Sequence, residues 1–288
     1  MNKVKERKSD SQSPIEECTE LERIEIHLLL NGIYLKYGAD FRNYAFTSIR
    51  RRIWHRIKAE KLQTVSSLLE KILHDPATMD RLYADFSINV TEMFRDPSFF
   101  MAFREKIVPQ LKDLPFIRIW HAGCSTGEEA YSMAILLHEE GLYNKTRIYA
   151  TDMNANVIKK AQTRKFPLHR MQTYTSNYFN SGGKNAFSEY YSTDEQYACF
   201  HSYLADNITF AQHNLVTDGS FNEFHVIICR NVLIYFNREL QNRVHQLFYD
   251  SLSPNGYLGL GNREGLSYTD GSDLFNEVLK KERIYQKK

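Results

Sequence analysis

Hydrophobic and polar positions follow a helical period through the first third of the chain. From about Leu21 to Asp85 the apolar residues recur at helical spacing, separated by short polar breaks. The segments that predict helices are LERIEIHLLLNGIYLKYG, AFTSIRRRIWHRIKAE, VSSLLEKIL and PATMDRLYADF. We therefore expect an all-helical N-terminal domain over residues 19–86. Residues 1–18 are polar and lack this pattern, so we expect a disordered tail there.

The pattern changes after Asp85. Residues 87–114 begin with the extended or loop-like segment SINVTEMFR and continue in a helix, for which Asp96 is the predicted N-cap and Pro97 the first residue. Beyond Leu114, short apolar runs typical of strands alternate with helical segments. The predicted strands contain FIRIWHAG, RIYATD, NITFAQHNL, FHVIICRN and GYLGLG. This alternation predicts an α/β domain over residues 115–288, with a mostly parallel sheet and helices on both faces.

A polar segment interrupts the alternation at about residues 166–206. It is rich in Tyr and Ser, contains the turn signal Gly182-Gly183, and has two strand-like runs, SEYYS and YACFHSY. We predict a small antiparallel β-subdomain inserted into the larger domain, of the kind that usually serves recognition.

The composition narrows the class of protein. Hydrophobic residues make up 42% and charged residues 25% of the chain, as in an ordinary globular protein, and every apolar run is too short for a membrane-spanning helix. The basic start of the chain has no apolar run behind it, which is not typical of a signal peptide. The four cysteines lie far apart without a CxxC pair. We therefore expect reduced thiols, a cytoplasmic location, no membrane insertion and no metal site.

Positive charge is concentrated in one predicted helix, although the net charge is only +2. The segment at 41–61 contains Arg50, Arg51, Arg52 and Arg56 with further basic residues, against the single acid Glu60. Such a run is either a solvated helix face or a docking surface for an acidic partner.

The loop after the first strand of the α/β domain reads AGCSTGEE, and it suggests a ligand site. Gly123 and Gly127 permit a tight turn and close approach of a ligand to the backbone. The third glycine of a dinucleotide fingerprint and the lysine of a phosphate-binding loop are both missing. Glu128 and Glu129 would repel a pyrophosphate at this helix N-terminus. We expect a cationic or neutral ligand with Glu129 facing it, although first-turn acids also stabilise helices electrostatically.

Polar residues also follow the next three strands. Asp152 stands where a Rossmann-like fold places the carboxylate that binds ribose hydroxyls, with capping of the following helix as the alternative. Asn214 and Asn231 each suit an adenine edge or a ligand carboxylate, and each could equally satisfy loop backbone. The carboxyl ends of parallel strands meet at one edge, so these residues predict a single site.

Several separated motifs resemble the chemotaxis receptor glutamate O-methyltransferases, the CheR-type family that modifies methyl-accepting chemotaxis proteins. They are INVTEMFRDPSFF, RIWHAGCSTGEEAYSMAILL, ATDMN, HNL and FHVIICRNVLIYF, in this order. The resemblance covers nearly the whole chain after the tail. The sequence departs from the family at Ala130, where proline is usual, and at GNREGL (261–266), where a Gly-His-Ser-Glu run is expected.

The resemblance implies an all-helical N-terminal domain followed by a Rossmann-like S-adenosylmethionine-dependent methyltransferase domain with a small antiparallel β-subdomain insert. It implies a linker at 87–114 that closes over the cofactor, and S-adenosylhomocysteine as a product. The cofactor-binding residues implied are Asn89, Thr91, Arg95, Gly123, Glu129, Asp152, Asn214, Leu215, Asn231 and Val232. Arg95, Arg230 and Tyr235 would be catalytic, beside the transferred methyl and the substrate.

The reaction implied is methylation of glutamate carboxylates on the cytoplasmic helices of chemoreceptors, giving glutamyl methyl esters in chemosensory adaptation. A glutamate with a pKa of about 4.3 is already ionised at neutral pH, so this chemistry needs no general base. The resemblance favours docking as the role of Arg50, Arg51, Arg52 and Arg56. It also suggests that the β-subdomain binds a receptor C-terminal tether. We expect a monomer without a nucleic-acid partner.

Two alternatives remain open at this point. The basic helix and the aromatic content also suit a methyltransferase that acts on RNA, or one that acts on a small molecule, but no Asn-Pro-Pro-Tyr-type motif is present. A non-catalytic adaptor that binds the cofactor is the second alternative. Candidate residues at every cofactor position argue against it.

Overall fold

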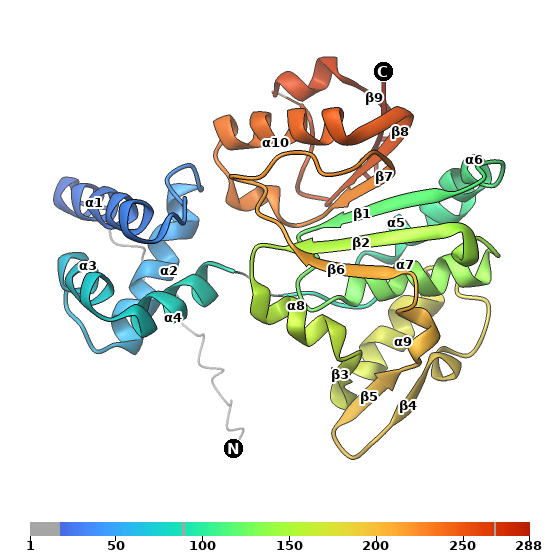
Figure 1. Ribbon diagram of the computed structural model, residues 1–288, viewed down its shortest axis with the longest axis horizontal. Helices are drawn as coiled ribbons and strands as arrows, with labels where there is room; N and C mark the ends of the chain where they lie inside the picture. The colour runs from blue at the N-terminus through green and yellow to red at the C-terminus, as the bar shows by residue number, and fades with distance from the viewer. Residues whose placement is uncertain (1–17, 88–89, 268) are drawn as a thin grey trace, which may run out of the picture.

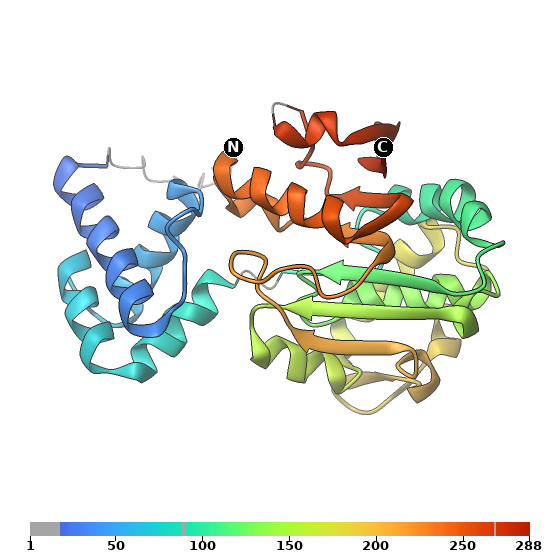
Figure 2. The same cartoon turned by 45° about the horizontal axis from the view of Figure 1, so that its top comes forward.

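The computed structural model describes residues 18–87, 90–267 and 269–288. All of the predicted tail except Cys18 lies outside these residues. The N-terminal domain consists of α1 (Glu20–Tyr37), α2 (Phe46–Ala59), α3 (Val65–His74) and α4 (Pro76–Phe86). These helices stand to one side of the rest of the chain in both views (Figures 1 and 2). The prediction of an all-helical domain is confirmed.

Polar caps and one apolar core explain this domain. The side chain of Thr19 accepts a hydrogen bond at the start of α1, and Asp75 caps α4 ahead of a proline. Each helix contributes apolar side chains to a shared core, among them Ile33, Ile53 and Leu68. Because each helix buries only one face, the domain needs all of them to be stable.

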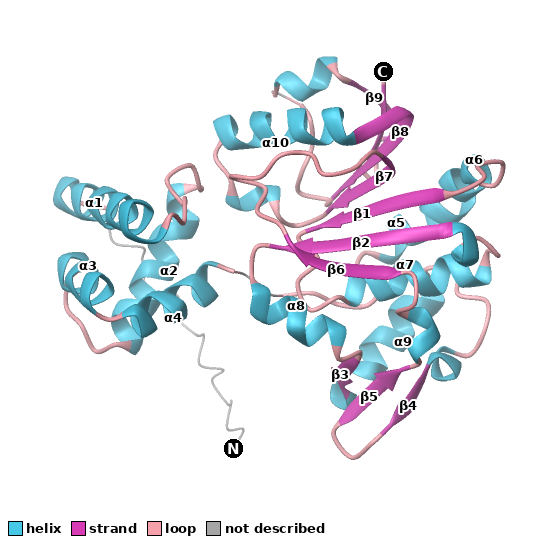
Figure 3. Cartoon of the chain, viewed as in Figure 1, coloured by secondary structure: helices cyan, strands magenta, loops and turns pink. Residues whose placement is uncertain are grey.

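The larger domain is built on one mixed sheet (Figure 3). Its strands follow the order β6 (Ile208–Gln212), β2 (Thr146–Asp152), β1 (Ile117–Ala122), β7 (Phe224–Cys229), β8 (Leu252–Leu260), β10 (Ile284–Lys287) and β9 (Phe275–Leu279). The pairs from β6 to β8 are parallel, whereas β10 is antiparallel to β8 and β9. The predicted α/β class is confirmed. The last two strands were not predicted, because their runs are short and partly polar.

Helices cover both faces of the sheet, and the side chains of β1 alternate between them. Ile119 belongs to the core that includes α7 (Glu128–Glu139), while Trp120 packs in the core on the other face with α10 (Arg238–Ser251). The remaining helical segments are α5 (Pro97–Ala102), the π-helix η1 (Phe103–Ile107), α6 (Val108–Leu111) and α8 (Ala155–Gln162). Short 3-10 turns are η2 (Tyr143–Lys145), η3 (Leu168–Arg170), η4 (Phe187–Tyr190), η5 (Ser202–Leu204), η6 (Leu233–Tyr235) and η7 (Asp270–Asp273).

The start of α5 lies where the sequence predicted it. Asp96 is the N-cap residue and Pro97 is the first residue of the helix. Asp96 has a φ of 54°, however, and its side chain makes no capping hydrogen bond. Its carboxylate instead lies 2.6 Å from the guanidinium of Arg230, a charged partner far along the chain.

The insert is a small antiparallel sheet with a helix. Its strands lie in the order β3 (Lys165–Pro167), β5 (Tyr197–Phe200) and β4 (Tyr191–Thr193). The two strand-like runs predicted β4 and β5, whereas β3 was not predicted. The helix α9 (Met171–Asn180) was not predicted, since its sequence is polar apart from aromatic residues. Tyr174 and Tyr178 bury their rings in the core shared with α7, which ties the insert to the main domain.

The helical domain is joined to the main domain at the carboxyl ends of the strands, toward which β1 and β2 point in Figure 2. Tyr44 and Phe236 form an antiparallel bridge. The backbone N–H of Ala45 donates to the carbonyl of Tyr235 at 2.7 Å, and the N–H of Asn237 donates to the carbonyl of Asn43 at 2.9 Å. Backbone hydrogen bonds therefore hold the two domains together next to the loop that carries Tyr235.

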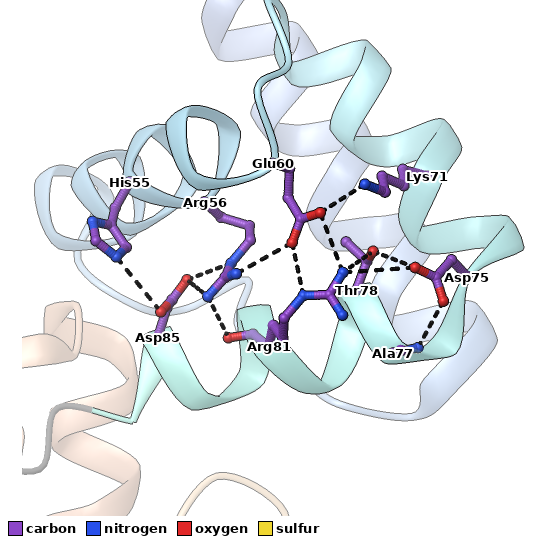
Figure 4. A network of polar contacts seen from close by, with 9 residues as sticks. All are labelled: His55, Arg56, Glu60, Lys71, Asp75, Ala77, Thr78, Arg81 and Asp85. Carbon is purple, nitrogen blue, oxygen red and sulfur yellow. Dashed lines mark hydrogen bonds and ion pairs between the residues drawn. The ribbon is translucent and has the colours of Figure 1, made fainter.

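The acid that ends α2, its C-cap residue Glu60, organises much of the polar surface of the helical domain (Figure 4). The carboxylate of Glu60 accepts hydrogen bonds from Arg56, Lys71 and Arg81, and its side chain is only 9% exposed. Arg56 also pairs with Asp85 at 2.7 Å. Hydrogen bonds from Arg81 and Lys71 lower the pKa of Glu60 to about 2. One carboxylate thus joins α2, α3 and α4.

We predict that Glu60→Gln lowers the free energy of unfolding at pH 7 by about 1 kcal/mol. The pKa of this group is depressed from an ordinary 4.5 to about 2, so its contribution is complete above 4.5 and is lost as the pH falls through about 2. Urea unfolding of the wild type and the variant at several pH values from 7 to 3 should show a difference that narrows with acidity. Glu70→Gln, at an exposed position on α3, is the control; a difference independent of pH would contradict the assignment.

Candidate active site

A cavity that is open to solvent lies at the carboxyl ends of the central strands. Residues from the helical domain, such as Tyr44 and Phe86, also contribute to its wall. The site residues expected from the sequence that line it are Thr91, Arg95, Gly123, Glu129, Asp152, Asn214, Leu215, Arg230, Asn231, Val232 and Tyr235. Asn89 lies outside the residues that the structure describes.

The glycine loop forms one wall of this cavity. Gly123 and Gly127 have φ values of 82° and 95°, a region that side-chain-bearing residues rarely adopt. The N–H groups of Gly123 and Cys124 both donate to the carbonyl of Thr151, which ties the loop to the end of β2. A Cβ added at Gly123 would lie 2.5 Å from Cγ2 of Val232. Glycine is therefore required here by both the backbone angle and the close approach.

Asp152 lines the cavity and does not cap α8. The cap is Asn154, whose side chain accepts from the N–H of Asn156. Asp152 accepts from the N–H groups of Ser125 and Asn154, each at 3.0 Å. Burial raises the pKa of Asp152, and these two amide hydrogen bonds oppose the shift. The carboxylate is thereby fixed between the glycine loop and the start of α8, where hydroxyl groups of a ligand could donate to it.

The two acids at the start of α7 have different surroundings. Glu128 is buried away from the cavity, where it accepts from the hydroxyl of Thr126 at 2.6 Å. Glu129 lines the cavity and is held by two donors, His121 at 2.9 Å and Arg230 at 3.1 Å. Burial raises the pKa of Glu129, but the hydrogen bond from His121 and the charge of Arg230 outweigh it, so the net shift is downward.

Glu129 is the centre of a chain of hydrogen-bonded polar groups that sequence reasoning missed. His121 donates from one side, and on the other side Arg230 also binds Asp96 at 2.6 Å and the carbonyl of Arg95 at 3.0 Å. The guanidinium of Arg230 lies over the ring of Phe99, 4.3 Å from its centroid. The only sign of this arrangement in the sequence was His121, a histidine inside a predicted buried strand. Arg230 is therefore held rigidly, and it joins the linker to the sheet.

The linker lies across the cavity and is tied down from two directions. The N–H of Phe94 donates to the hydroxyl of Ser132 on α7, and Arg170 of the insert donates to the carbonyl of Thr91 at 3.1 Å. Arg95 donates to the carbonyl of Val90 at 2.9 Å. No carboxylate forms an ion pair with Arg95 among residues 18–87, 90–267 and 269–288. It is thus a cation at the cavity without a paired anion in the described chain.

Asn214 and Asn231 line the cavity, and both also make hydrogen bonds that stabilise their own loops. The side-chain oxygen of Asn214 accepts from the N–H of Val216 at 3.0 Å, which leaves its amide donors available to a ligand. Asn231 has a φ of 62° and its N–H donates to Glu264 at 2.8 Å. Leu215 is buried next to Asn214 and offers an apolar surface.

The four arginines of α2 divide into two pairs. Arg50 binds Glu22 through two nitrogens, and Arg56 belongs to the Glu60 network of Figure 4. Arg51 is exposed and Arg52 is half-buried, and neither forms an ion pair within the described part of the chain. Burial lowers the pKa of Arg52, with the charge of Arg51 acting in the same direction. Only Arg51 and Arg52 therefore present an unpaired positive charge.

Two family models match this chain along nearly its whole described length. The CheR methyltransferase all-alpha domain matches residues 24–87, and the CheR methyltransferase SAM binding domain matches residues 89–282. The chain belongs to the CheR methyltransferase family. It is therefore an S-adenosylmethionine-dependent methyltransferase, and S-adenosylmethionine is its cofactor. Among the described helices of this CheR-family chain, none is long and apolar enough to cross a membrane.

Curated relatives agree with this assignment. The chain is 48% identical over 264 residues to the putative methyltransferase Cher3 of Pseudomonas putida, covering 92% of this chain and 97% of that protein. It is 31% identical over 229 residues to a chemotaxis protein methyltransferase of Listeria innocua, covering 79% and 84%. Chemotaxis protein methyltransferase 1 of Pseudomonas aeruginosa is 24% identical over 238 residues, covering 76% and 82%.

We predict that Gly123→Ala weakens binding of S-adenosylhomocysteine about tenfold, because overpacking costs about 1–3 kcal/mol and Val232 would have to move. Gly141→Ala is a matched control, since Gly141 has a φ of 70° but no atom within 4 Å of an added Cβ. Titration calorimetry measures the affinity of both folded variants for S-adenosylhomocysteine. Gly123→Ala combines the clash with backbone strain, whereas Gly141→Ala introduces backbone strain alone. Equal affinities would show that the contact with Val232 does not matter.

Proposed function

We propose that this CheR-family enzyme methylates glutamate side chains on the cytoplasmic helices of chemoreceptors and produces glutamyl methyl esters. Relatives named chemotaxis protein methyltransferases support the class of substrate. The observation that carries the proposal is Arg95, a cation at the cofactor cavity that has no ion pair among the described residues. An ionised glutamate would supply the missing negative charge.

The cavity residues fit the cofactor. The carboxylate of Glu129, already fixed by two donors, suits a positively charged amino group, and Asp152 suits ribose hydroxyls. Leu215 and the amide donors of Asn214 suit a purine ring. Thr91, Asn231 and Val232 would complete the enclosure with the glycine loop. Bound S-adenosylmethionine supplies an electrophilic methyl group on a sulfonium.

The chain's own residues would act by orientation rather than by proton transfer. A glutamate acceptor with a pKa of about 4.3 arrives ionised, so no base has to remove a proton. Arg95 would orient this carboxylate, Arg230 would hold the linker closed, and the hydroxyl of Tyr235 would donate a hydrogen bond beside the methyl. Excluding water strengthens these contacts, and correct alignment of the reacting atoms lowers the barrier further.

Transfer of labelled methyl to a chemoreceptor cytoplasmic fragment tests the function directly. Label that is incorporated and then released as methanol by mild alkali would establish a carboxyl methyl ester. Alkali-stable label would mean transfer to nitrogen or carbon. Transfer to RNA or to a small molecule in place of the fragment would support a different methyltransferase, and cofactor binding without any transfer would support an adaptor.

We predict that Tyr235→Phe lowers kcat about fivefold, the usual effect of losing one neutral hydrogen bond of about 1 kcal/mol. Binding of S-adenosylhomocysteine should stay close to that of the wild type, because the ring is retained. Tyr257→Phe on β8, outside the cavity, is the control. Wild-type kcat in a folded Tyr235→Phe variant would remove Tyr235 from the mechanism.

The docking part of the proposal now rests on Arg51 and Arg52, since Arg50 and Arg56 are already paired within the domain. Both residues lie on α2, whose neighbour in space is the segment carrying Tyr235. An acidic, glutamate-bearing receptor helix is the complementary surface. The edge strand β4 is a second candidate contact, because an extended receptor tether could pair with its free backbone groups.

We predict that Arg51→Glu with Arg52→Glu lowers kcat/KM for the receptor fragment about tenfold or more at low salt, through loss of electrostatic steering. The dependence of the rate on salt should flatten in the same variant. Lys280→Glu with Lys281→Glu makes the same change of charge at exposed positions on the C-terminal hairpin and should have little effect. Equal rates for both double variants would exclude α2 as the docking surface.

A further inference from the structure

Glu264 makes the densest set of backbone contacts of any side chain near the cofactor cavity. It follows β8 and is 6% exposed. One carboxylate oxygen accepts from the N–H of Val232 at 2.8 Å and of Leu233 at 2.7 Å. The other accepts from the N–H of Asn231 at 2.8 Å and of Gly261 at 2.6 Å. A single side chain thus binds a run of consecutive amides in the loop after β7.

That loop carries much of the candidate active site. Arg230, Asn231, Val232 and Tyr235 all line the cavity. The amides that Glu264 binds lie at the start of η6, where a helical turn leaves its first N–H groups without partners in the turn itself. Asn231 has a left-handed φ of 62°, a conformation that persists only when the surroundings fix it.

Gly261 lies so close to Glu264 and Asn231 that a side chain at position 261 would disturb their hydrogen bond. A Cβ added at Gly261 would lie 2.5 Å from a carboxylate oxygen of Glu264 and 2.9 Å from the nitrogen of Asn231. Gly261 and Glu264 are the first and last residues of the GNRE run, which keeps the Gly and Glu of the family's Gly-His-Ser-Glu pattern. The residues that differ, Asn262 and Arg263, make no hydrogen bond to the 231–234 loop in the described structure.

The charge of Glu264 has no side-chain cation to balance it. It forms no ion pair within the described residues, and its partners are backbone amides. Burial raises the pKa of Glu264, and the amides of Asn231, Gly261, Val232 and Leu233 oppose the shift. The geometry therefore shows a buried carboxylate whose partners are the amides of one loop and of Gly261.

We propose that Glu264 is a positioning residue for methyl transfer. It holds the 230–235 loop so that Asn231 and Val232 meet the cofactor, Arg230 stays bound to the linker and Tyr235 meets the acceptor. The cofactor half of this inference is independent of the acceptor, whereas the half that concerns Tyr235 rests on the proposed function. Glu264 acts only through the loop, because it does not line the cavity itself.

The test compares Glu264→Gln, which replaces one acceptor oxygen by an N–H₂ donor facing other donors, with Glu264→Asp, which keeps the carboxylate. Glu277→Gln on β9 removes the same charge at an exposed position and is the matched control. Calorimetry with S-adenosylhomocysteine needs no acceptor. Melting curves followed by circular dichroism show whether each variant is folded at the assay temperature.

Affinity for S-adenosylhomocysteine should fall about tenfold or more in Glu264→Gln, less in Glu264→Asp, and not at all in Glu277→Gln, since small displacements of positioning groups have large effects. Wild-type affinity in folded Glu264→Gln would overturn the inference. If that variant does not fold, wild-type affinity and kcat in folded Glu264→Asp would overturn it instead. Failure of the wild type to methylate a receptor would refute the proposed function and leave this binding comparison intact.

Discussion

The parallel pairing of β1 with β2 on one side and β7 on the other is the constraint on which the site depends. Its register places Ala122 opposite Thr151, and His121 opposite both Ala150 and Ile228. Gly123 and Arg230 follow their strands and Asp152 ends β2, so all three reach the same edge of the sheet although they lie far apart in the sequence. Ladder hydrogen bonds set this spacing, and the loops have only to turn toward a common centre. A slip of one residue would reverse the side chains of β1 and separate His121 from Glu129.

Two carboxylates, half-buried Asp152 and buried Glu264, then shape the loops that leave this edge. Asp152 binds the amides of Ser125 and Asn154, and Glu264 binds those of the loop after β7. In each case the carboxylate accepts from backbone donors that the turn leaves unpaired. The loops consequently have defined conformations before any ligand arrives. Such preorganisation lowers the entropy that must be lost when a ligand binds.

Local sequence patterns predicted the helices and strands well. They did not predict which side chains pair across the fold. Hydrophobic period and turn residues predicted the helices of the first domain, the alternation of strands and helices, and the antiparallel insert. Because Glu129, Asp152 and Asn231 lie just beyond or at the ends of parallel strands, the sequence predicted that they share one site, and they line one cavity. The partner of Arg230 was missed, because Asp96 lies at a separation of 134 residues and was expected to cap a helix. The positive charge of the basic helix is also less available than the sequence suggested, because Arg50 pairs with Glu22 of α1 and Arg56 pairs with Asp85 of α4. Pairings of this kind depend on tertiary packing, which no local period encodes.

The seam between the two domains, where residues 43–45 meet residues 235–237, determines how the domains tolerate mutation. Ala45 donates to the carbonyl of Tyr235, and Asn237 donates to the carbonyl of Asn43, so main-chain atoms supply part of the attachment. The side chains of Asn237 and Asn43 add a hydrogen bond at 3.2 Å, and the rings of Tyr44 and Phe236 meet edge to face. Every amino acid except proline offers the same N–H and C=O groups. Substitutions at 43, 45 and 237 other than proline would therefore weaken the seam without removing the main-chain hydrogen bonds that align the helical domain with the transferase domain.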